Sequence, residues 1–419
     1  MALERLRRLA QGIGLAKPVA ASRWKASVVL DRGFLGEACL ALDGQGRGAA
    51  LWENGGRLWT MPVGVQAKPA LVRLPLEEGK APWMDLNPDG RGLALWQVEK
   101  AGERLILGKL LGHGERGSQV LFRTGGQIRH LQAAVDRRGN ALMIWLLEKD
   151  GQVEVMAQAF DTREQSWEQA PTRLGSPTLA TAEPRLAANH REHAMVLWEV
   201  SEGNDEGLVA SHYWPSDRIW SDRPVPVVSH ATRHHQVVMD GSGNALAIWI
   251  HAPYGQRRTL EASFYDVIAG EWGEPEVLSS AHSFSIPRLV MSGEGEALAA
   301  WCQSEGHGPP HLLTKRFSGG RWHSGLTCFE LGHGPVRDFA VDIGPEGMAG
   351  LLAVHHGADG DWVSVRLLEQ EWSAPVSLVP PSRASCSSPR LSLSPRGVSA
   401  LWIQGVGREQ TLFLAETHA

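Results

Sequence analysis

Apolar and polar residues alternate along most of the chain after residue 22, in short runs separated by polar turns that contain glycine. The clearest unit, VVMDGSGNALAIW, ends at Trp249 and consists of two alternating runs on either side of such a turn. Alternation with a period of two is typical of β-strands that bury one face, and a glycine-containing turn between them is typical of a hairpin. The unit therefore predicts two antiparallel strands.

The same unit occurs eight times. Seven copies end in a tryptophan: Trp52, Trp96, Trp145, Trp198, Trp249, Trp301 and Trp402. The remaining copy, VDIGPEGMAGLLA, has Ala353 in the place of the tryptophan. The mean period between Trp52 and Trp402 is about 50 residues, which is the length of a four-stranded propeller blade.

A second tryptophan marks the outer half of five units, 19 to 23 residues after the first position: Trp167, Trp220, Trp272, Trp322 and Trp372. The first two units lack this marker, but their segments KPALVRLPL and SQVLFRT have the pattern of outer strands. Each unit therefore predicts four strands, and we expect the first tryptophan of each unit to pack between neighbouring blades.

The two ends of the chain complement one another. The last unit ends at Ala419 after only three strands, whereas Trp24 opens the strand-like segment WKASVVL before the first unit. We expect residues 22–30 to form the outermost strand of the eighth blade, so that the ring closes without an open edge. The sequence thus predicts an all-β fold, one eight-bladed β-propeller over residues 22–419, preceded by an extension over residues 1–21.

In the extension, four apolar residues lie beside arginines at the spacing of a short amphipathic helix: Leu3, Leu6, Leu9 and Ile13. Such a helix could dock on a partner subunit or a membrane surface, cap the propeller, or remain unstructured. The apolar run is too interrupted for a secretory signal, and no run of about 18 apolar residues exists that could span a bilayer. We expect a cytoplasmic location, or a periplasmic or extracellular one if a leader has been removed.

The composition adds few constraints. Seventeen tryptophans against three tyrosines, together with 47 glycines, favour many short strands joined by tight turns. The net charge of -5 gives no reason to expect a nucleic-acid partner. Four scattered cysteines form neither a disulfide framework nor a CxxC metal pair, and we expect them to be buried: Cys39, Cys302, Cys328 and Cys386. No cofactor motif is found.

A candidate site emerges when the innermost strands are aligned on their tryptophans. One equivalent position then holds Cys39, Trp83, Gln132, Arg185, Gln236, Arg288, Ala340 and Arg390. Three further arginines lie a few residues earlier on other blades: Arg129, Arg233 and Arg337. Guanidinium groups bind carboxylate, sulfate or phosphate in bidentate fashion. We therefore expect these six arginines, with Gln132, Gln236 and Trp83, to bind a small anion or an acidic protein tail at one channel mouth.

A structural role for the same arginines is an open alternative. The tripeptide Pro-Arg-Leu occurs at 184–186, 287–289 and 389–391, so each arginine could instead bond carbonyl groups of neighbouring loops. Asp85 and Asp342, near the same rim, could also neutralise the positive charge locally.

Histidines form a second group in the predicted loops: His230, His234, His235, His251, His307, His311, His355 and His356. A metal ion would require three or four of them to converge, usually with a carboxylate. Their spacing matches no zinc helix motif, and solvated loop histidines are the alternative. We predict no metal site.

The pattern D-x-x-G-N-A-x-A-x-W resembles the repeats of tryptophan-rich bacterial β-propellers, a group often described as sialidase-like. This resemblance covers nearly the whole chain after residue 22 and implies the fold. The chain departs from the sialidases in having eight units rather than six and no serine-containing aspartate box. As nucleophile and base it offers only Tyr254 with Glu199 or Glu305.

We therefore expect a non-catalytic binding or assembly module, which recognises a protein partner or an anionic ligand. The alternative is a carbohydrate-active protein, either a lectin or a sialidase-like glycosidase, that uses aromatic rings at the rim such as Trp83, Trp214 and Trp362.

Overall fold

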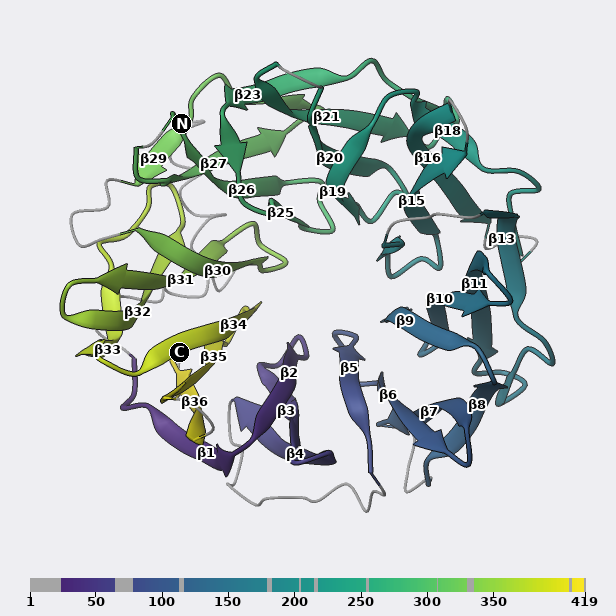
Figure 1. Cartoon of the computed structure of the whole chain (residues 1–419), viewed down its shortest axis with the longest axis horizontal. Coiled ribbons are helices and arrows are strands. Elements are labelled where there is room, and N and C mark those ends of the chain that lie inside the picture. The colour runs from purple at the N-terminus through teal and green to yellow at the C-terminus, as the bar shows by residue number, and fades with distance from the viewer. Residues whose placement is uncertain are drawn as a thin grey trace, which may run out of the picture.

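Eight β-sheets stand around a central axis, each forming one blade of a ring (Figure 1). The computed structural model describes residues 24–64, 78–112, 117–178, 183–202, 205–214, 218–253, 256–306, 308–329, 335–406 and 409–417. These residues contain 36 strands and no helix; none of them therefore belongs to a helix that could cross a membrane. The prediction of an all-β, eight-bladed propeller is confirmed. The extension over residues 1–21 and its expected helix lie outside the described residues.

Blades 1 to 4 follow one another along the chain. Blade 1 comprises β2 (Leu35–Leu42), β3 (Arg47–Asn54) and β4 (Arg57–Gly64), and blade 2 comprises β5 (Lys80–Leu86), β6 (Gly92–Lys100), β7 (Glu103–Leu111) and β8 (Gln119–Thr124). Blade 3 comprises β9 (Gln127–Val135), β10 (Ala141–Lys149), β11 (Gln152–Asp161), β12 (Ser166–Trp167) and β13 (Thr172–Thr178). Blade 4 comprises β14 (Arg185–Ala188), β15 (Ala194–Glu202), β16 (Asp205–Trp214), β17 (Ile219–Trp220) and β18 (Val225–Val228).

Blades 5 to 8 complete the ring. Blade 5 comprises β19 (Thr232–Met239), β20 (Ala245–His251), β21 (Arg258–Asp266), β22 (Glu271–Trp272) and β23 (Glu276–Ala281). Blade 6 comprises β24 (Ser283–Phe284), β25 (Arg288–Met291), β26 (Ala297–Ser304), β27 (His311–Ser318), β28 (Arg321–Trp322) and β29 (Thr327–Phe329). Blade 7 comprises β30 (Val336–Ile343), β31 (Ala349–Gly357), β32 (Gly360–Leu368) and β33 (Val376–Ser382), and blade 8 comprises β34 (Ser385–Ser394), β35 (Gly397–Val406), β36 (Glu409–Glu416) and β1 (Val28–Gly33).

The outer strands agree with the sequence pattern. In blades 3 to 6 the outer position holds two short strands in succession, and the second tryptophan of the unit lies in the first of them. Each of these tryptophans is paired with an aromatic residue of the neighbouring strand, as Tyr265 is with Trp272 at a ring distance of 5.4 Å. The segment SQVLFRT forms β8 as predicted, whereas KPALVRLPL lies outside the described residues.

The ring closes through the N-terminal strand. β1 pairs antiparallel with β36, so that Val28 lies opposite Leu414, and Trp24 forms a further bridge with Thr417 (Figure 1). This confirms the predicted closure. Asp31 of β1 also accepts hydrogen bonds from Trp52 Nε1 at 2.8 Å and Asn54 Nδ2 at 2.9 Å in blade 1. The closing strand therefore holds two neighbouring blades together.

The repeat tryptophans pack between blades, as predicted. Trp52 is 1% exposed and contacts apolar residues of blade 8, and each later repeat tryptophan packs against the blade that precedes its own. Ala353, which replaces the tryptophan in blade 7, lies opposite Phe339 of the innermost strand. Phe339 is buried in the same cluster as Ala353, so this phenylalanine supplies an aromatic ring where the tryptophan is missing.

In seven blades an Asp, Asn or Ser side chain closes the first turn, whereas blade 7 has Gly344 at this position and closes its turn with backbone bonds. In blade 5, Asp240 accepts hydrogen bonds from the backbone N–H groups of Ser242 and Asn244, and Gly243 adopts a φ of +100°. Neighbouring turns are also joined to one another from blade 1 to blade 6, for example by Asn189 Nδ2, which donates to the Asp240 carbonyl at 2.9 Å. The first turns of all blades lie on one side of the ring, here called the turn side. On this side, hydrogen bonds connect the turns of blades 1 to 6 in series.

One expectation about the cysteines is wrong. Cys39, Cys302 and Cys386 lie inside the fold, and burial raises the pKa of each thiol to about 12. Cys328, in contrast, is exposed. It lies on β29, an outermost strand in which Thr327 and Cys328 are exposed and only Phe329 is buried against the blade.

Candidate functional site

Strand register brings the eight aligned residues to one level of the ring. Arg185 pairs with Leu197, Arg288 with Ala300 and Arg390 with Leu401. In every blade the partner is the residue immediately before the repeat tryptophan, or before Ala353 in blade 7. The alignment made from the sequence therefore identifies structurally equivalent positions, which we call the ring position.

The ring position lies at one end of a central cavity of about 720 Å³. All eight innermost strands line this cavity, beginning one to three residues after the ring position and ending at the turn side. Its wall combines apolar and polar residues, and Asp85 and Asp342 are among the polar ones. Burial raises the pKa of Asp85 to about 6 and that of Asp342 to about 7, because the cavity wall solvates a carboxylate poorly. Each carboxylate accepts a backbone hydrogen bond from the next blade.

Arg288 is the arginine of the ring position whose charge is least compensated. Burial lowers the pKa of its guanidinium; Asp338 opposes this, and the positive charges of Arg390 and Arg185 lower the pKa further. The three arginines are therefore close enough to repel one another. The Arg288 guanidinium makes no hydrogen bond or ion pair with any residue that the structure describes.

Two other residues at the ring position serve the architecture. Arg390 donates from Nε to the Ala38 carbonyl of blade 1 and from Nη1 to the Pro389 carbonyl, both at 3.0 Å. Gln132 donates from Nε2 to the Pro184 carbonyl of blade 4 at 2.6 Å and accepts from the Leu186 N–H group at 3.1 Å. These contacts support the structural alternative for Arg390 and Gln132.

Three adjacent blades carry hydrogen-bond donors that lack partners. Arg185 in blade 4 forms an ion pair with Glu183, but its Nε group is buried without a hydrogen-bond partner. Gln236 in blade 5 has a buried Nε2 group with none. Together with Arg288 in blade 6, they place unpaired donors at one level on neighbouring strands. Arg185 Nε and Gln236 Nε2 are buried, and buried donors without a partner are rare in folded proteins unless an ion, a water or a ligand satisfies them.

The arginines three residues before the ring position are arranged differently. Arg129 pairs with Glu148 at 3.1 Å, Arg337 lies 3.4 Å from Asp361, and Arg233 is exposed. Arg129 and Arg233 line a second cavity, of about 540 Å³, which spans blades 3 to 5. Trp83, the ninth predicted site residue, is half-buried and packs against the core between blades 2 and 3.

A backbone bulge explains the position of Arg129 and Arg233. The register of β9 and β10 shifts by one residue, so that Arg129 lies opposite Leu146; the same shift places Arg233 opposite Ile250. The bulge contains His130 and His234, which have φ values of +52° and +56° although neither is glycine. Because the bulge takes up one residue, Arg129 and Arg233 lie opposite residues two positions beyond the partners of Gln132 and Gln236. They therefore lie on the same strand face as the ring position, one step farther from the turn side.

The predicted histidines do not converge on a metal. Among the described residues there is no group of three or more His, Cys, Asp or Glu side chains that could hold a metal ion. His235 lies 3.3 Å from Glu199, and His356 lies 2.6 Å from Asp361. His307 and Tyr254 lie outside the described residues, and Glu305, the other acid considered with Tyr254, pairs with Arg257 and His282.

The aromatic residues proposed for a sugar-binding rim are packed against neighbours. Trp362 is buried and stacks on His355, with ring centroids 4.6 Å apart. Trp214 is half-buried, with its ring 4.0 Å from that of His212. With Trp83 also packed against a core, none of the three rings offers a fully open face.

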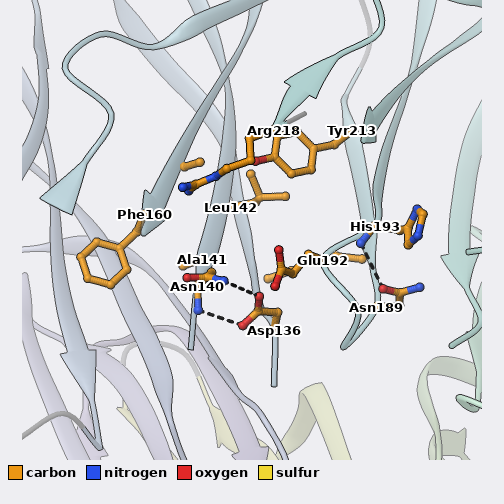
Figure 2. A pocket seen from close by; sticks show the side chains of 13 residues that line it. Asp136, Asn140, Ala141, Leu142, Phe160, Asn189, Glu192, His193, Tyr213 and Arg218 are labelled. Atoms are coloured by element: carbon orange, nitrogen blue, oxygen red, sulfur yellow. Dashed lines mark hydrogen bonds between the residues drawn. The ribbon is translucent and has the colours of Figure 1, made fainter. Parts of the chain in front are cut away.

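One pocket between blades 3 and 4 was not anticipated from the sequence (Figure 2). Its lining includes Asp136 and Asn140, joined by two hydrogen bonds of 2.8 Å, together with Glu192, Tyr213 and Arg218. The volume of about 30 Å³ leaves room for roughly one water molecule. Asp136, Asn140 and Glu192 belong to the repeated turns of blades 3 and 4, whereas Tyr213 and Arg218 lie outside them, so the repeat gives no signal for these two residues.

Comparison with known proteins identifies the architecture. No protein-family model matches the sequence, and the search of curated proteins gave no match. Among solved structures, the chain is similar to the polysaccharide lyase Uly1, with a TM-score of 0.53 and 8% identity over 94% of this chain and 99% of that chain. It is also similar to the lectin BP39L from Burkholderia pseudomallei, with a TM-score of 0.51 and 13% identity over 83% of this chain and 99% of that chain. The WD40 domain of SCAP from fission yeast is also similar (TM-score 0.50, 9% identity, 95% and 98%). At these low sequence identities, the structural similarity shows the fold alone, a β-propeller that a lyase, a lectin and a WD40 domain share.

Proposed function

We propose that this propeller is a non-catalytic binding module whose channel mouth binds an anionic group of a protein partner or a ligand. The observation that carries the proposal is the set of unpaired donors on blades 4, 5 and 6, namely Arg185 Nε, Gln236 Nε2 and the Arg288 guanidinium. All three belong to the ring position, at the mouth of the central cavity.

The chemistry of these N–H groups favours a ligand that accepts hydrogen bonds. Arginine has no acceptor atom and stays charged, so an unpaired, partly desolvated guanidinium is stabilised by carboxylate, phosphate or sulfate oxygens. The free side-chain amide N–H of Gln236 favours the same kind of group. Arg390, whose Nε and Nη1 atoms bond carbonyl groups, contributes positive charge.

The direct test is the substitution Arg288→Gln, with titration calorimetry of phosphate, sulfate, acetate and an acidic peptide. We expect the wild-type chain to bind at least one of these anions, more weakly as salt is added, and the variant to bind it at least about tenfold more weakly. Phosphate or sulfate binding would indicate a free anion or phosphorylated group, whereas binding of the acidic peptide alone would indicate a protein tail.

A matched control separates this site from general surface charge. Arg321 is exposed on β28 and lies away from the channel mouth, so Arg321→Gln should leave anion binding unchanged. Equal binding by the wild-type chain and Arg288→Gln, or equal losses in the two variants, would remove the proposal.

A further inference from the structure

We propose that a cavity between blades 5 and 6 is a second binding site, separate from the channel mouth, and that it binds the arginine side chain of a peptide. We call this cavity the blade 5–6 groove. Its volume of about 410 Å³ lies within the range usual for small-molecule sites. Strands β21, β22 and β23 of blade 5 line one side of the groove, and Phe317 and Trp322 of blade 6 line the other.

Strand register places three carboxylates on the blade 5 side of the groove. Asp266 lies two residues after Phe264 on β21, and Phe264 packs against the core between blades 5 and 6. Glu271 lies directly opposite Asp266, and Glu276 lies opposite Ala262, which is buried in the same core. Residues two apart on a strand, and residues directly opposite each other, share a face of the sheet, so all three carboxylates face blade 6.

These carboxylates have no cation as a partner among the described residues. The Asp266 carboxylate accepts hydrogen bonds only from the backbone N–H groups of Ile268 and Ala269, and the side chains of Glu271 and Glu276 make no hydrogen bond or ion pair there. Asp266 and Glu271 are like charges at directly opposite positions, which destabilises a strand pair. A cation bound between them would remove this repulsion.

The equivalent place between blades 3 and 4 is occupied by an arginine of the chain itself. Asp161 and Asp266 are equivalent, since each directly follows the residue that pairs with the second tryptophan of its unit. Asp161 forms an ion pair with Arg218, two residues before the second tryptophan of blade 4. Blade 6 has Gly320 two residues before its second tryptophan, so this position supplies no guanidinium to Asp266. The comparison within the chain indicates a guanidinium as the missing cation.

The floor of the groove suits a planar cation. The rings of Phe264 and Phe317 lie with their centroids 5.7 Å apart, and the Trp322 ring lies 5.3 Å from that of Phe317. A guanidinium stacks on aromatic faces, whereas an ammonium group is more strongly hydrated. Trp322 is only 9% exposed, and its indole N–H makes no hydrogen bond with any described residue. This N–H group is available to donate to a carbonyl oxygen of the bound peptide.

The charges of the lining favour an arginine residue of a peptide over free arginine. Four of the described lining residues are acidic, and Arg321 is the only basic one. Arg321 precedes Trp322 on β28, so strand alternation turns its side chain to the opposite face of the strand. Free arginine would bring an α-carboxylate to this negatively charged lining, whereas the flanking peptide bonds of an arginine residue are neutral.

The experiment is titration calorimetry on the whole chain with the tripeptides Gly-Arg-Gly and Gly-Lys-Gly, blocked at both ends, and with free arginine. We expect the arginine peptide to bind at least about fivefold more tightly than either other ligand, and more weakly as salt is added. Glu271→Gln changes an exposed residue and should weaken binding of the arginine peptide about tenfold. Asp266→Asn, which keeps an oxygen for the turn, should have a similar effect.

Glu346→Gln is the matched control, because it changes an exposed glutamate between β30 and β31 and should leave the affinity unaltered. The proposal would be overturned if the arginine peptide gave no heat of binding at concentrations up to about 10 mM. Equal binding of the arginine and lysine peptides, tighter binding of free arginine, or unchanged affinity in both carboxylate variants would also overturn it. Anion binding at Arg288 is measured with different ligands, so either site can fail without the other.

Discussion

The closing strand gives the sharpest test of how the ring is held together. Asp31→Ala removes the carboxylate that accepts hydrogen bonds from Trp52 Nε1 and Asn54 Nδ2. The indole N–H of Trp52, a residue only 1% exposed, would then be left inside the fold without a partner. Loss of a hydrogen bond to a charged acceptor costs about 1.5–3 kcal/mol.

That cost falls on the closed state, because water can bond the indole once β1 has separated. The free energy of local opening of β1 should therefore decrease by about 1.5–3 kcal/mol, which corresponds to roughly tenfold to 150-fold faster exchange of the β1 and β36 amides. Hydrogen–deuterium exchange measured strand by strand is the assay.

Two further variants define the result. Asp359→Ala changes an exposed aspartate in the turn between β31 and β32 and should leave exchange unaltered. Trp52→Phe, which has no N–H group to satisfy, should reduce the effect of Asp31→Ala when the two changes are combined. If the β1 and β36 amides exchange alike in the wild type and Asp31→Ala, the assignment of this carboxylate to the seam is refuted.

Three other outcomes are expected. Arg390→Gln should lower the free energy of unfolding in urea by about 1–3 kcal/mol, because the Ala38 carbonyl of blade 1 loses its donor. Arg288→Gln should not lower the free energy of unfolding. Similar losses in the two variants would contradict the different roles of the two arginines. Burial raises the pKa of Asp342 from 3.8 to about 7, so the wild-type chain should lose stability as pH rises from about 4 to about 7. In thermal melts at a series of pH values, Asp342→Asn should show a smaller loss over that range. Identical profiles of the two chains would argue against the raised pKa. Gly360→Ala should destabilise the fold by about 3 kcal/mol or more, because φ is +111° and the new Cβ would lie 1.8 Å from the Ser382 carbonyl oxygen. Gly117→Ala, where a new Cβ would have no atom within 4 Å, should be nearly neutral in the same urea denaturation assay.

The architecture could be predicted because its determinants are local. An aspartate such as Asp240 closes its own turn by bonding N–H groups two and four residues later, which fixes the register of the hairpin. Counting from the tryptophan therefore gave the ring position correctly in all eight blades. The closing strand could be predicted because the last repeat lacks its outer strand.

The site could be predicted only in part, because its determinants are not local. Whether an arginine is paired depends on the backbone of another blade, and Arg390 and Ala38 are 352 residues apart. The bulges within β9 and β19 are equally hidden, since His130 and His234 adopt left-handed φ values without any glycine to indicate them. Each bulge places its arginine, Arg129 or Arg233, on the same strand face as the residue at the ring position.

Trp24 pairs with Thr417, so the first and last described residues of the chain lie side by side in blade 8. The ring could therefore be built from a chain that starts in another blade. A short peptide joining these neighbouring residues would turn the sheet of blade 8 into a continuous covalent unit, and new termini could be opened in the exposed turn at residues 358–359. Such a circular permutant would keep the described strands of every blade and would place its new chain ends in blade 7. The place in the ring at which the chain begins and ends can thus be moved by design while the strand pairing of blade 8 is kept.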